Sequence, residues 1–555
     1  MEMPGVSAAS AEEYSRTGLW QDRLVDSYLD EAARGRPEDT AVVAQGRRVT
    51  YRALHQLARR VAAGLAALGV RKGDVVSFQL PNWVEALALH HGILKAGAVS
   101  NPIIPIYRHR ELEFILRQAR TKVAVIPGRF RGFDYPAMFE DIRSGLPDLN
   151  HLLVVGGTAP GMASFDDFLQ EAWEQQEAAT IVARMERSAN DPMLLLYTSG
   201  TTAEPKGAVH THNTLDYENR SIIEFFALTG NDVVFMPSPV THITGVLYGL
   251  QLPVMLATKV VFQDVWEPGE ALRLIAEERC SFTVSATPFL HALTYHPELA
   301  KHDMRSLRIF ACGGADVSPE LIRAATERLG CCAARVYGST EYPTLTASGP
   351  EDPLEKRAQT DGRIIGAARG RVVDNSGRPL PPGQEGEIVA RGPEMFLGYL
   401  NPALNADAFD PDGWFRTGDL AVLYADGYVE IKGRKKDIII RGGENISAKE
   451  VEDLLLEHPK VKQVAIVAMP DPVLVERACA FVVTKGGEAL TLEEVVAFLK
   501  TRRIAMQKLP ERVEVVPALP MTASGKIQKF KLREQIKAEL AQERARQGGE
   551  RAARA

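Results

Sequence analysis

Apolar residues recur with a helical period near the start of the chain. Between residues 49 and 75 they are spaced by three and four positions, at Leu54, Leu57, Val61, Leu65 and Leu68. This spacing predicts a helix, which the glycines and basic residues of GVRKGD (69–74) end. Strand-like apolar runs such as VVSFQL (75–80) and KVAVIP (122–127) alternate with further helical segments. Because such alternation builds parallel sheets, we predict an α/β fold with parallel-rich sheets covered by helices.

The hydrophobic pattern changes twice in the later part of the chain. From residue 360 to 432, short strand-like runs and many turns predict a β-rich subdomain. GRKKDIIIRGGENI (433–446) is dense in charge and glycine and is typical of a hinge. A small α+β domain follows, in which Ser447 and Glu450 are spaced as a capping box. We therefore predict a large N-terminal domain (1–435), a small mobile C-terminal domain (436–535) and a charged, disordered tail (536–555).

Composition narrows the class of protein. The chain has 555 residues, of which 45% are hydrophobic and 25% charged, and its net charge of −6 argues against nucleic acid as a partner. Its five cysteines have neither zinc-type spacing nor a disulfide framework, the N-terminus lacks a signal peptide, and no apolar run reaches about 20 residues. We expect a cytoplasmic protein with no membrane span. The choice between monomer and homodimer stays open.

The stretch YTSGTTAEPKG (197–207) carries the first candidate chemistry. It combines hydroxyl groups, glycines and one lysine, a composition suited to phosphate. The order of Lys206 and Gly207 is the reverse of that in the common P-loop, and no Ser or Thr follows the lysine. Taken alone, the stretch is more typical of a Ser/Thr-rich surface turn.

Four further polar stretches follow. In YGSTEYP (337–343) a tyrosine could stack on a base, and Thr340 and Glu341 suit a phosphate and its Mg²⁺. Asp419, in GWFRTGDL (413–420), suits a pair of ribose hydroxyls. The remaining two are the cationic GRKKD (433–437) and a Ser-Gly turn that carries Lys526. Each of these stretches, by itself, is also typical of an ordinary polar turn.

In this order and at these separations, the motifs resemble those of the adenylate-forming superfamily, which comprises acyl-CoA synthetases, luciferases and peptide-synthetase adenylation domains. GGADVSPE (313–320) also corresponds to one of its core motifs, and the resemblance covers roughly residues 20–535. It implies an acid–thiol ligase that uses ATP, Mg²⁺ and CoA. A carboxylic acid first displaces pyrophosphate from ATP to give acyl-AMP, and a thiol then displaces AMP. The chain has no G-x-S-x-G or HExxH motif, which disfavours hydrolases and zinc proteases.

The resemblance also implies a role for individual residues. The loop over the β- and γ-phosphates would comprise Thr198, Ser199, Gly200, Thr201, Thr202 and Lys206. The adenine site would comprise Tyr337, which stacks on the base, and Gly313, Gly314, Ala315, Gly338 and Ser339. Thr340 would bond the α-phosphate and Glu341 would hold Mg²⁺. Asp419, with help from Arg434, would bind the ribose.

The remaining implied roles concern the two half-reactions. Lys526 would stabilise charge during adenylation, and Lys436 matches the hinge about which the small domain rotates. His242 matches the junction between acyl group and thiol. After rotation the thiol channel would be shaped by Arg441, Gly442 and Gly443.

The acid itself is constrained by residues 233–253, VVFMPSPVTHITGVLYGLQLP. The stretch has no carboxylate, so the ammonium of an amino acid would be buried without a partner. The motifs look most like those of bacterial cyclohexanecarboxylate and medium-chain acyl-CoA ligases. The alternatives are an aromatic acid–CoA ligase, a ligase that loads the pantetheine of a carrier protein, and a silent nucleotide-binding protein.

Overall fold

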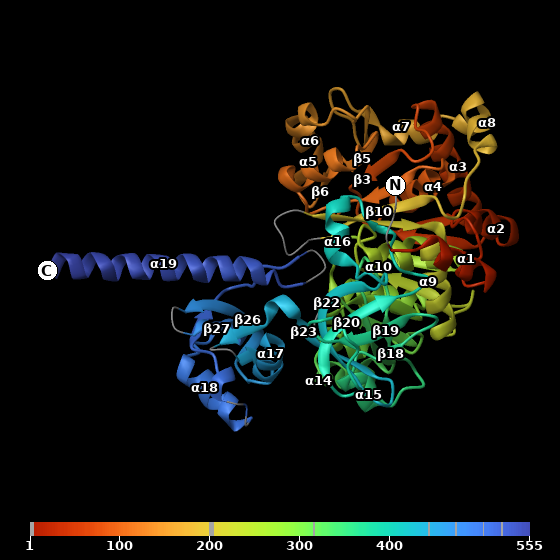
Figure 1. Cartoon of the computed structure of the whole chain (residues 1–555). Coiled ribbons are helices and arrows are strands. Elements are labelled where there is room, and N and C mark those ends of the chain that lie inside the picture. Colours follow the sequence, from red (N-terminus) through yellow and green to blue (C-terminus); the bar gives the residue numbers. More distant parts are fainter. Residues whose placement is uncertain are drawn as a thin grey trace. The chain divides into compact units, whose positions relative to one another are not determined.

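The computed structural model describes residues 5–198, 205–314, 317–441, 444–471, 474–502, 504, 506–522 and 526–554 (Figure 1). The chain forms two compact units. The first comprises Met1–Gly370 and Val389–Arg416, and the second Arg371–Ile388 and Thr417–Ala555. The predicted β-rich subdomain (360–432) is thus divided between the two units, and the predicted domain boundaries stay a prediction.

The first unit contains a nine-stranded sheet. Its order is β18 (Arg363–Ile364), β17 (Thr346–Ala347), β16 (Cys332–Tyr337), β15 (Ile309–Gly313), β14 (Phe282–Ala286), β12 (Val233–Met236), β13 (Lys259–Phe262), β1 (Thr40–Ala44) and β2 (Arg47–Thr50). The six strands from β16 to β1 are parallel, and the edge strands are antiparallel to their neighbours.

The second large sheet of this unit has eight strands. Its order is β21 (Gly398–Tyr399), β11 (Lys206–Thr211), β10 (Pro192–Thr198), β4 (Val99–Pro102), β3 (Val75–Phe78), β5 (Val123–Pro127), β8 (His151–Val155) and β9 (Ala163–Ser164). The run from β10 to β9 is parallel, whereas β11 pairs antiparallel with both β10 and β21. The predicted α/β class with parallel-rich sheets is confirmed.

The helices of the first unit begin and end where local chemistry allows. The predicted first helix is α3 (Tyr51–Ala67), whose N-terminus is capped by the Thr50 hydroxyl. α14 (Pro319–Leu329) starts with proline in its first turn and ends at Gly330, whose φ is 67°. The other helices of at least eight residues are α1 (Ala8–Arg16), α2 (Ser27–Gly35), α4 (Val84–Lys95), α5 (His109–Gln118), α6 (Tyr135–Ile142), α8 (Glu177–Arg184), α9 (His212–Phe225), α12 (Pro268–Glu278) and α13 (Thr287–Thr294).

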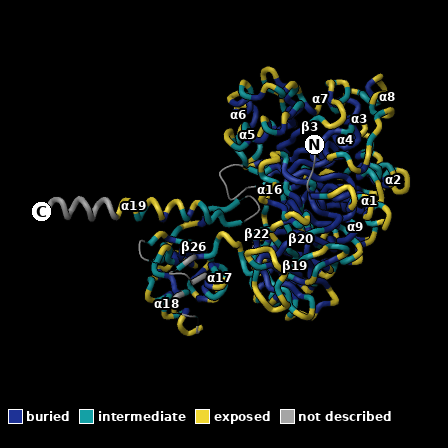
Figure 2. Tube along the Cα trace, viewed as in Figure 1, coloured by how far each residue is buried: buried dark blue, intermediate teal, exposed yellow. Residues whose placement is uncertain are grey.

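Two of these helices lie deep in the core. Every residue of α4 is buried, as are ten residues of α9, and buried chain surrounds α4 and β3 (Figure 2). Both helices carry polar side chains into the interior, among them His90 and Lys95 on α4 and Asp216 and Glu218 on α9, and such buried groups need hydrogen-bond or ionic partners. Shorter elements are α7 (Phe165–Gln170), α10 (Ile243–Gly245), the π-helix η3 (Val246–Gln251), α11 (Leu252–Met255), α15 (Leu354–Gln359) and α16 (Asn405–Ala408).

The second unit contains two smaller sheets. One has the order β19 (Arg369–Val373), β20 (Glu385–Arg391), β22 (Phe415–Leu423) and β23 (Val429–Arg434), and three of these strands reach across the boundary between the units. The other comprises β25 (Glu444–Ile446), β24 (Ile439–Arg441), β27 (Val475–Thr484), β26 (Val461–Asp471) and β28 (Arg512–Val515).

The α-helices in the described part of the second unit are α17 (Ala448–Leu456), α18 (Leu492–Thr501) and α19 (Lys529–Arg554). One half of the predicted capping box forms, because Ser447 Oγ accepts a hydrogen bond from the Glu450 amide, whereas the Glu450 carboxylate pairs with Lys508. The charged segment from residue 536, which we expected to be disordered, lies in α19 as far as Arg554.

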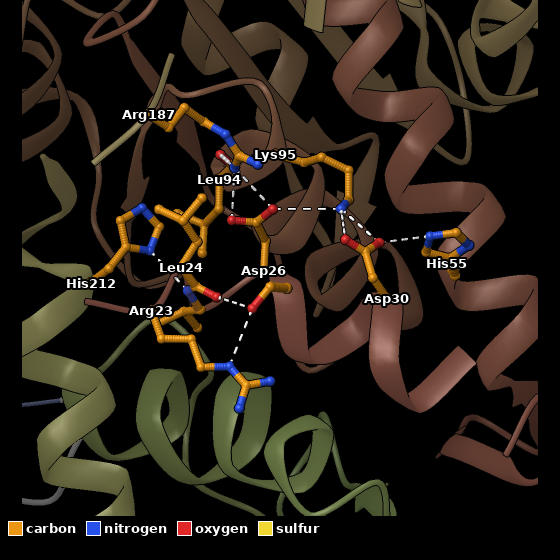
Figure 3. A network of polar contacts seen from close by, with 11 residues as sticks. Arg23, Leu24, Asp26, Asp30, His55, Leu94, Lys95, Arg187 and His212 are labelled. Atoms are coloured by element: carbon orange, nitrogen blue, oxygen red, sulfur yellow. Dashed lines mark hydrogen bonds and ion pairs between the residues drawn. The ribbon is translucent and has the colours of Figure 1, made fainter. Parts of the chain in front are cut away.

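A buried charge network ties together four parts of the first unit (Figure 3). The side chain of Asp26 has no exposure to solvent and lies 2.8 Å from Arg187 Nη1 and 3.5 Å from Lys95 Nζ. Lys95 also pairs with Asp30, which contacts His55. Burial opposes ionisation of Asp26, but Arg187 and Lys95 hold its pKa below the usual value. The carboxylate therefore stays charged and joins α2 to α4 and to the segment that leads into β10.

We expect Asp26→Asn to lower the free energy of unfolding of the first unit by about 3 kcal/mol or more, because it leaves buried cations without their counter-charge. Urea unfolding followed by tryptophan fluorescence tests this, since all five tryptophans (Trp20, Trp83, Trp173, Trp266 and Trp414) belong to that unit. Asp303→Asn is the control, because Asp303 forms an exposed pair with Arg305 and should have little effect. An unchanged midpoint for Asp26→Asn would contradict the assigned role.

Candidate functional site

The predicted phosphate loop connects two paired strands. β10 ends at Thr198 and β11 begins at Lys206, and these two residues face each other in the antiparallel register. The Thr198 hydroxyl lies 3.5 Å from the Lys206 carbonyl oxygen. Predicted loop residues Ser199, Gly200, Thr201 and Thr202 lie outside the described residues. The pairing of β10 with β11 thus fixes both ends of the loop, where these two strands of the eight-stranded sheet meet it.

The predicted adenine site lies at the ends of two adjacent strands of the other sheet. β15 and β16 are parallel and pair Gly313 with Val336, so their following loops emerge at the same edge. A Cβ atom on Gly313 would lie 2.3 Å from the Val336 carbonyl oxygen. One on Gly338 would lie 1.9 Å from the Pro343 carbonyl oxygen. Only glycine fits these close backbone contacts. Gly314 follows directly, and Ala315 lies outside the described residues.

The turn after β16 is held from several sides. The Ser339 amide donates to the Tyr342 carbonyl, and the Tyr342 amide donates to Ser339 Oγ. Thr340 and Glu341 are both buried, and the carbonyl of Thr340 lies 2.7 Å from Nε2 of His210, on β11. Burial lowers the pKa of His210 to about 4, so the ring is neutral near pH 7. β11 therefore supports the predicted phosphate turn as well as the phosphate loop.

Tyr399 connects two of the predicted residues. Its hydroxyl donates to Glu341 Oε1 at 2.7 Å, and Lys206 Nζ lies 5.3 Å from the centre of its ring. β21, which carries Tyr399, pairs with β11, and the Phe396 amide donates to the Glu341 carbonyl. Lys206 and Glu341, which are far apart in the chain, thus both contact the side chain of Tyr399.

Two buried carboxyl groups lie next to this turn. Glu218, on α9, accepts hydrogen bonds from Tyr248 at 2.6 Å and from Thr344 at 2.7 Å, both at Oε1. Burial raises the pKa of Glu218 to about 7. Burial, and then the nearby Glu218, raise the pKa of Glu394 well above its usual value. The two acids therefore hold protons at a pH where most carboxyl groups are charged.

The predicted acyl–thiol residue His242 is half-buried and immediately precedes α10. The loop before it is anchored by Asn82, whose amide nitrogen donates to the carbonyls of Met236, Ser238 and Gln263. The Asn82 oxygen accepts from the Val240 amide at 2.9 Å. One buried amide thus fixes the backbone of this loop.

In the second unit, two predicted ribose-binding residues are paired. Asp419 on β22 lies opposite Arg434 on β23, and Arg434 Nε is 2.7 Å from Asp419 Oδ1. Asp419 is buried, and its amide donates to the Thr417 hydroxyl. The predicted hinge residue Lys436 is exposed and lies in a short turn after β23.

The other predicted residues of the second unit lie in separate elements. Arg441, on β24, pairs with Glu511 at 2.7 Å, and the channel residues Gly442 and Gly443 lie outside the described residues. Lys526 is half-buried; its amide donates to the Thr522 hydroxyl, and its carbonyl accepts a hydrogen bond from the Thr522 amide. Within the described ranges, no helix is long and apolar enough to cross a membrane.

Comparison with known proteins identifies the family. A model of the AMP-binding enzymes matches residues 29–400, and a model of the AMP-binding enzyme C-terminal domain matches residues 450–526. The chain belongs to the AMP-binding, adenylate-forming enzymes. The resemblance inferred from the sequence is confirmed, and the protein is an enzyme of the AMP-forming ligase family.

Relatives of this adenylate-forming enzyme act on different acids. It is 38% identical to the medium-chain fatty-acid–CoA ligase of Escherichia coli K12, over 96% of this chain and 93% of the relative. It is 36% identical to a salicylyl-CoA synthase/salicylate adenylyltransferase of Streptomyces, over 95% and 96%. The structure of ATP-bound MatB from Rhodopseudomonas palustris superposes with a TM-score of 0.84 at 28% identity, covering 93% of this chain and 99% of MatB.

The sequence motifs did not indicate four side chains that support the site, namely Asn82, His210, Glu218 and Tyr399. Each is a buried polar residue that contacts a segment distant in the chain. His210 is the one of the four that the sequence could have indicated, because it lies inside the apolar strand GAVHT (207–211) and a buried polar group needs a partner.

We expect Glu218→Gln to remove a pH dependence of stability. The unfolded state ionises Glu218 near pH 4.5 and the folded state near pH 7, so the folded state holds an extra proton between these values. Stability from this group is therefore lost as the pH rises from about 5 to 8, by about 3 kcal/mol. The free energy of unfolding of each protein is measured with urea at pH values of about 5 and about 8. Relative to the wild type, Glu218→Gln should be about 3 kcal/mol more stable at the higher pH than at the lower pH.

Glu224→Gln, at an exposed position on the same helix, is the control and should differ from the wild type equally at both pH values. A constant difference between Glu218→Gln and the wild type would mean that Glu218 ionises normally in the folded protein.

Proposed function

We propose that the enzyme activates a medium-chain or alicyclic carboxylic acid as acyl-AMP and then transfers the acyl group to CoA. The observation that carries the proposal is the cluster of Lys206, Tyr399 and Glu341, in a chain matched by both models of the AMP-binding enzymes. A cation, a carboxylate and a backbone turn suit the triphosphate of ATP better than they suit any neutral ligand.

In the proposed first step, an oxygen of the acid attacks the α-phosphorus of ATP. A new oxygen–phosphorus bond forms, the bond to the bridging oxygen of pyrophosphate breaks, and pyrophosphate leaves with the electron pair. Thr198, Lys206 and the loop between them would hold the leaving group. Such chemistry needs positioning and neutralised charge but no protein nucleophile.

Other residues would act on the α-phosphate and the acid during this step. The Thr340 hydroxyl would donate to an α-phosphate oxygen. The Lys526 ammonium would neutralise the charge that develops between acid and phosphate. Lys526 belongs to the predicted C-terminal domain, and we propose that rotation of this domain brings the ammonium to the site for the first step and removes it afterwards.

Glu341 would hold Mg²⁺. A carboxylate oxygen is a ligand that Mg²⁺ prefers, and the only side-chain hydrogen bond of Glu341 among the described residues engages Oε1, which leaves Oε2 for the ion. The described residues contain no cluster of three His, Cys, Asp or Glu side chains suited to a metal, in keeping with an ion that arrives with ATP. Bound there, Mg²⁺ would neutralise charge on the phosphates.

The nucleoside would be held by residues that the motifs single out for adenine and ribose. Tyr337 would stack on adenine, beside the backbone of Gly313 and Gly314. Asp419 would accept hydrogen bonds from the ribose hydroxyls, and the paired Arg434 would orient the Asp419 carboxylate.

In the second step, the sulfur of CoA would attack the acyl carbonyl as the thiolate. A carbon–sulfur bond forms, and the bond from carbon to the AMP oxygen breaks. The residues proposed to line the thiol path are His242, Arg441, Gly442 and Gly443, with Lys436 at the hinge of the preceding rotation.

Two observations support a medium-chain or alicyclic acid as the substrate. Residues 233–253 contain no carboxylate, and their buried side chains are largely aliphatic, including Val240, Ile243, Val246 and Leu247. The 38% identity to a medium-chain fatty-acid–CoA ligase supports the same class. The nearly equal identity to a salicylyl-CoA synthase favours an aromatic acid as the second candidate.

A panel of acids tests the function and the substrate together. Purified enzyme is incubated with ATP, Mg²⁺, CoA and one acid of medium-chain, alicyclic, aromatic or amino-acid type, and the release of AMP is measured. We expect kcat/KM to be highest for the medium-chain or alicyclic acids. A preference for aromatic acids would overturn the substrate proposal. If no acid causes release of AMP, the proposal that the enzyme is an acid–CoA ligase fails.

We expect Lys526→Ala to slow acid-dependent exchange of pyrophosphate into ATP by roughly a hundredfold or more, because it removes a charge used in the transition state. The same variant should still transfer the acyl group from supplied acyl-AMP to CoA at near the wild-type rate. Lys531→Ala, an exposed lysine on α19, is the control for both assays. An equal loss of both half-reactions in Lys526→Ala would contradict its assignment to adenylation alone.

A further inference from the structure

Tyr399 is held rigidly by contacts unrelated to either charged neighbour. Its backbone pairs with Ala208 of β11, and its amide donates to Asn405 Oδ1 at 2.8 Å. Its ring packs edge-on against Phe396, with 5.0 Å between ring centres, and only 5% of the residue is exposed. The ring and hydroxyl of Tyr399 therefore have one position, set by the sheet.

Each end of this fixed side chain contacts a different charged group. Lys206 Nζ lies over the ring face at 5.3 Å from its centre, a distance at which the negative face of an aromatic ring attracts a cation. The hydroxyl donates to Glu341 Oε1 at 2.7 Å, the length of a strong hydrogen bond to a charged acceptor. One aromatic side chain thus sets the distance between a lysine and a carboxylate that come from different loops.

We propose that Tyr399 is a positioning residue that sets the geometry of the metal–triphosphate complex, by aiming Glu341 at Mg²⁺ and holding Lys206 ready for the phosphates. The inference rests on the proposed use of ATP and adds a residue to that site. By occupying Oε1, the hydroxyl restricts the carboxylate rotamer and would leave Oε2 to hold the ion. The ring holds the ammonium weakly compared with a phosphate, so Lys206 can exchange one for the other.

Two substitutions separate the two contacts. Tyr399→Phe removes the hydroxyl and keeps the ring, whereas Tyr399→Leu removes both. Tyr424→Phe is the matched control, because Tyr424 belongs to the other unit and its hydroxyl also donates to a glutamate, Glu430.

The first readout is binding, without any acid present. The melting temperature of each protein is measured with ATP at increasing Mg²⁺. For Tyr399→Phe we expect the Mg²⁺ concentration that gives half of the ATP-induced shift to rise about tenfold, the size expected for losing one hydrogen bond to a charged group. Tyr399→Leu should show the same rise and, at saturating Mg²⁺, about threefold weaker ATP binding from loss of the ring contact.

The second readout is pyrophosphate exchange with the best acid of the panel. Tyr399→Phe should recover most of the wild-type rate at high Mg²⁺ with an unchanged KM for the acid. A merely structural role would instead lower the melting temperature of the free protein and leave the Mg²⁺ dependence as in the wild type and in Tyr424→Phe. That result would overturn the inference. If the wild type binds Mg²⁺ and ATP but exchanges no pyrophosphate with any acid, the ligase proposal fails, and the binding readout still decides the role of Tyr399.

Discussion

The ion pair between Asp26 and Arg187 is the constraint on which much of the first unit depends. The two residues are 161 positions apart in the chain, and the carboxylate has no exposure to solvent. Arg187 also donates to the carbonyl of Leu94, near the end of α4, and the amide of Val25 donates to His212 at the start of α9. Because a buried charge without a partner is costly, the start of α2, the end of α4 and the approach to β10 have one stable arrangement.

The candidate site follows from that arrangement through the eight-stranded sheet. The chain runs from Arg187 into β10, then through the phosphate loop into β11, and from His212 into α9. β11 in turn supports Thr340 through His210 and pairs with the strand of Tyr399, while α9 supplies Glu218 to Thr344. Three of the groups proposed to hold ATP, namely Lys206, Thr340 and Glu341, are thus attached to β11 directly, through His210, or through Tyr399.

The sequence alone predicted the parts of this structure that have a local pattern. The helical spacing from Leu54 to Leu68 lies within one short stretch of sequence. The glycines, hydroxyls and charges of each phosphate motif also lie close together in the sequence. The contact of Tyr399 with Glu341 spans 58 positions, and nothing in the residues beside Tyr399 indicates its partner. The division into units was equally hidden, because Val389–Arg416 returns to the first unit only through long-range pairing. Distances and hydrogen-bond partners of this kind depend on the tertiary fold.

The late position of β21 in the chain has a consequence for synthesis on the ribosome. β11 is complete at residue 211, but the strand that covers its outer edge begins only at Gly398. A nascent chain in which β10 and β11 have already paired would carry an unpaired strand edge next to the phosphate loop until β21 is made, and such edges recruit other chains. The binding of a chaperone to growing chains should be strongest in this interval and should end once Tyr399 has emerged. The residue that completes the triphosphate cluster is thus also the one that closes the sheet.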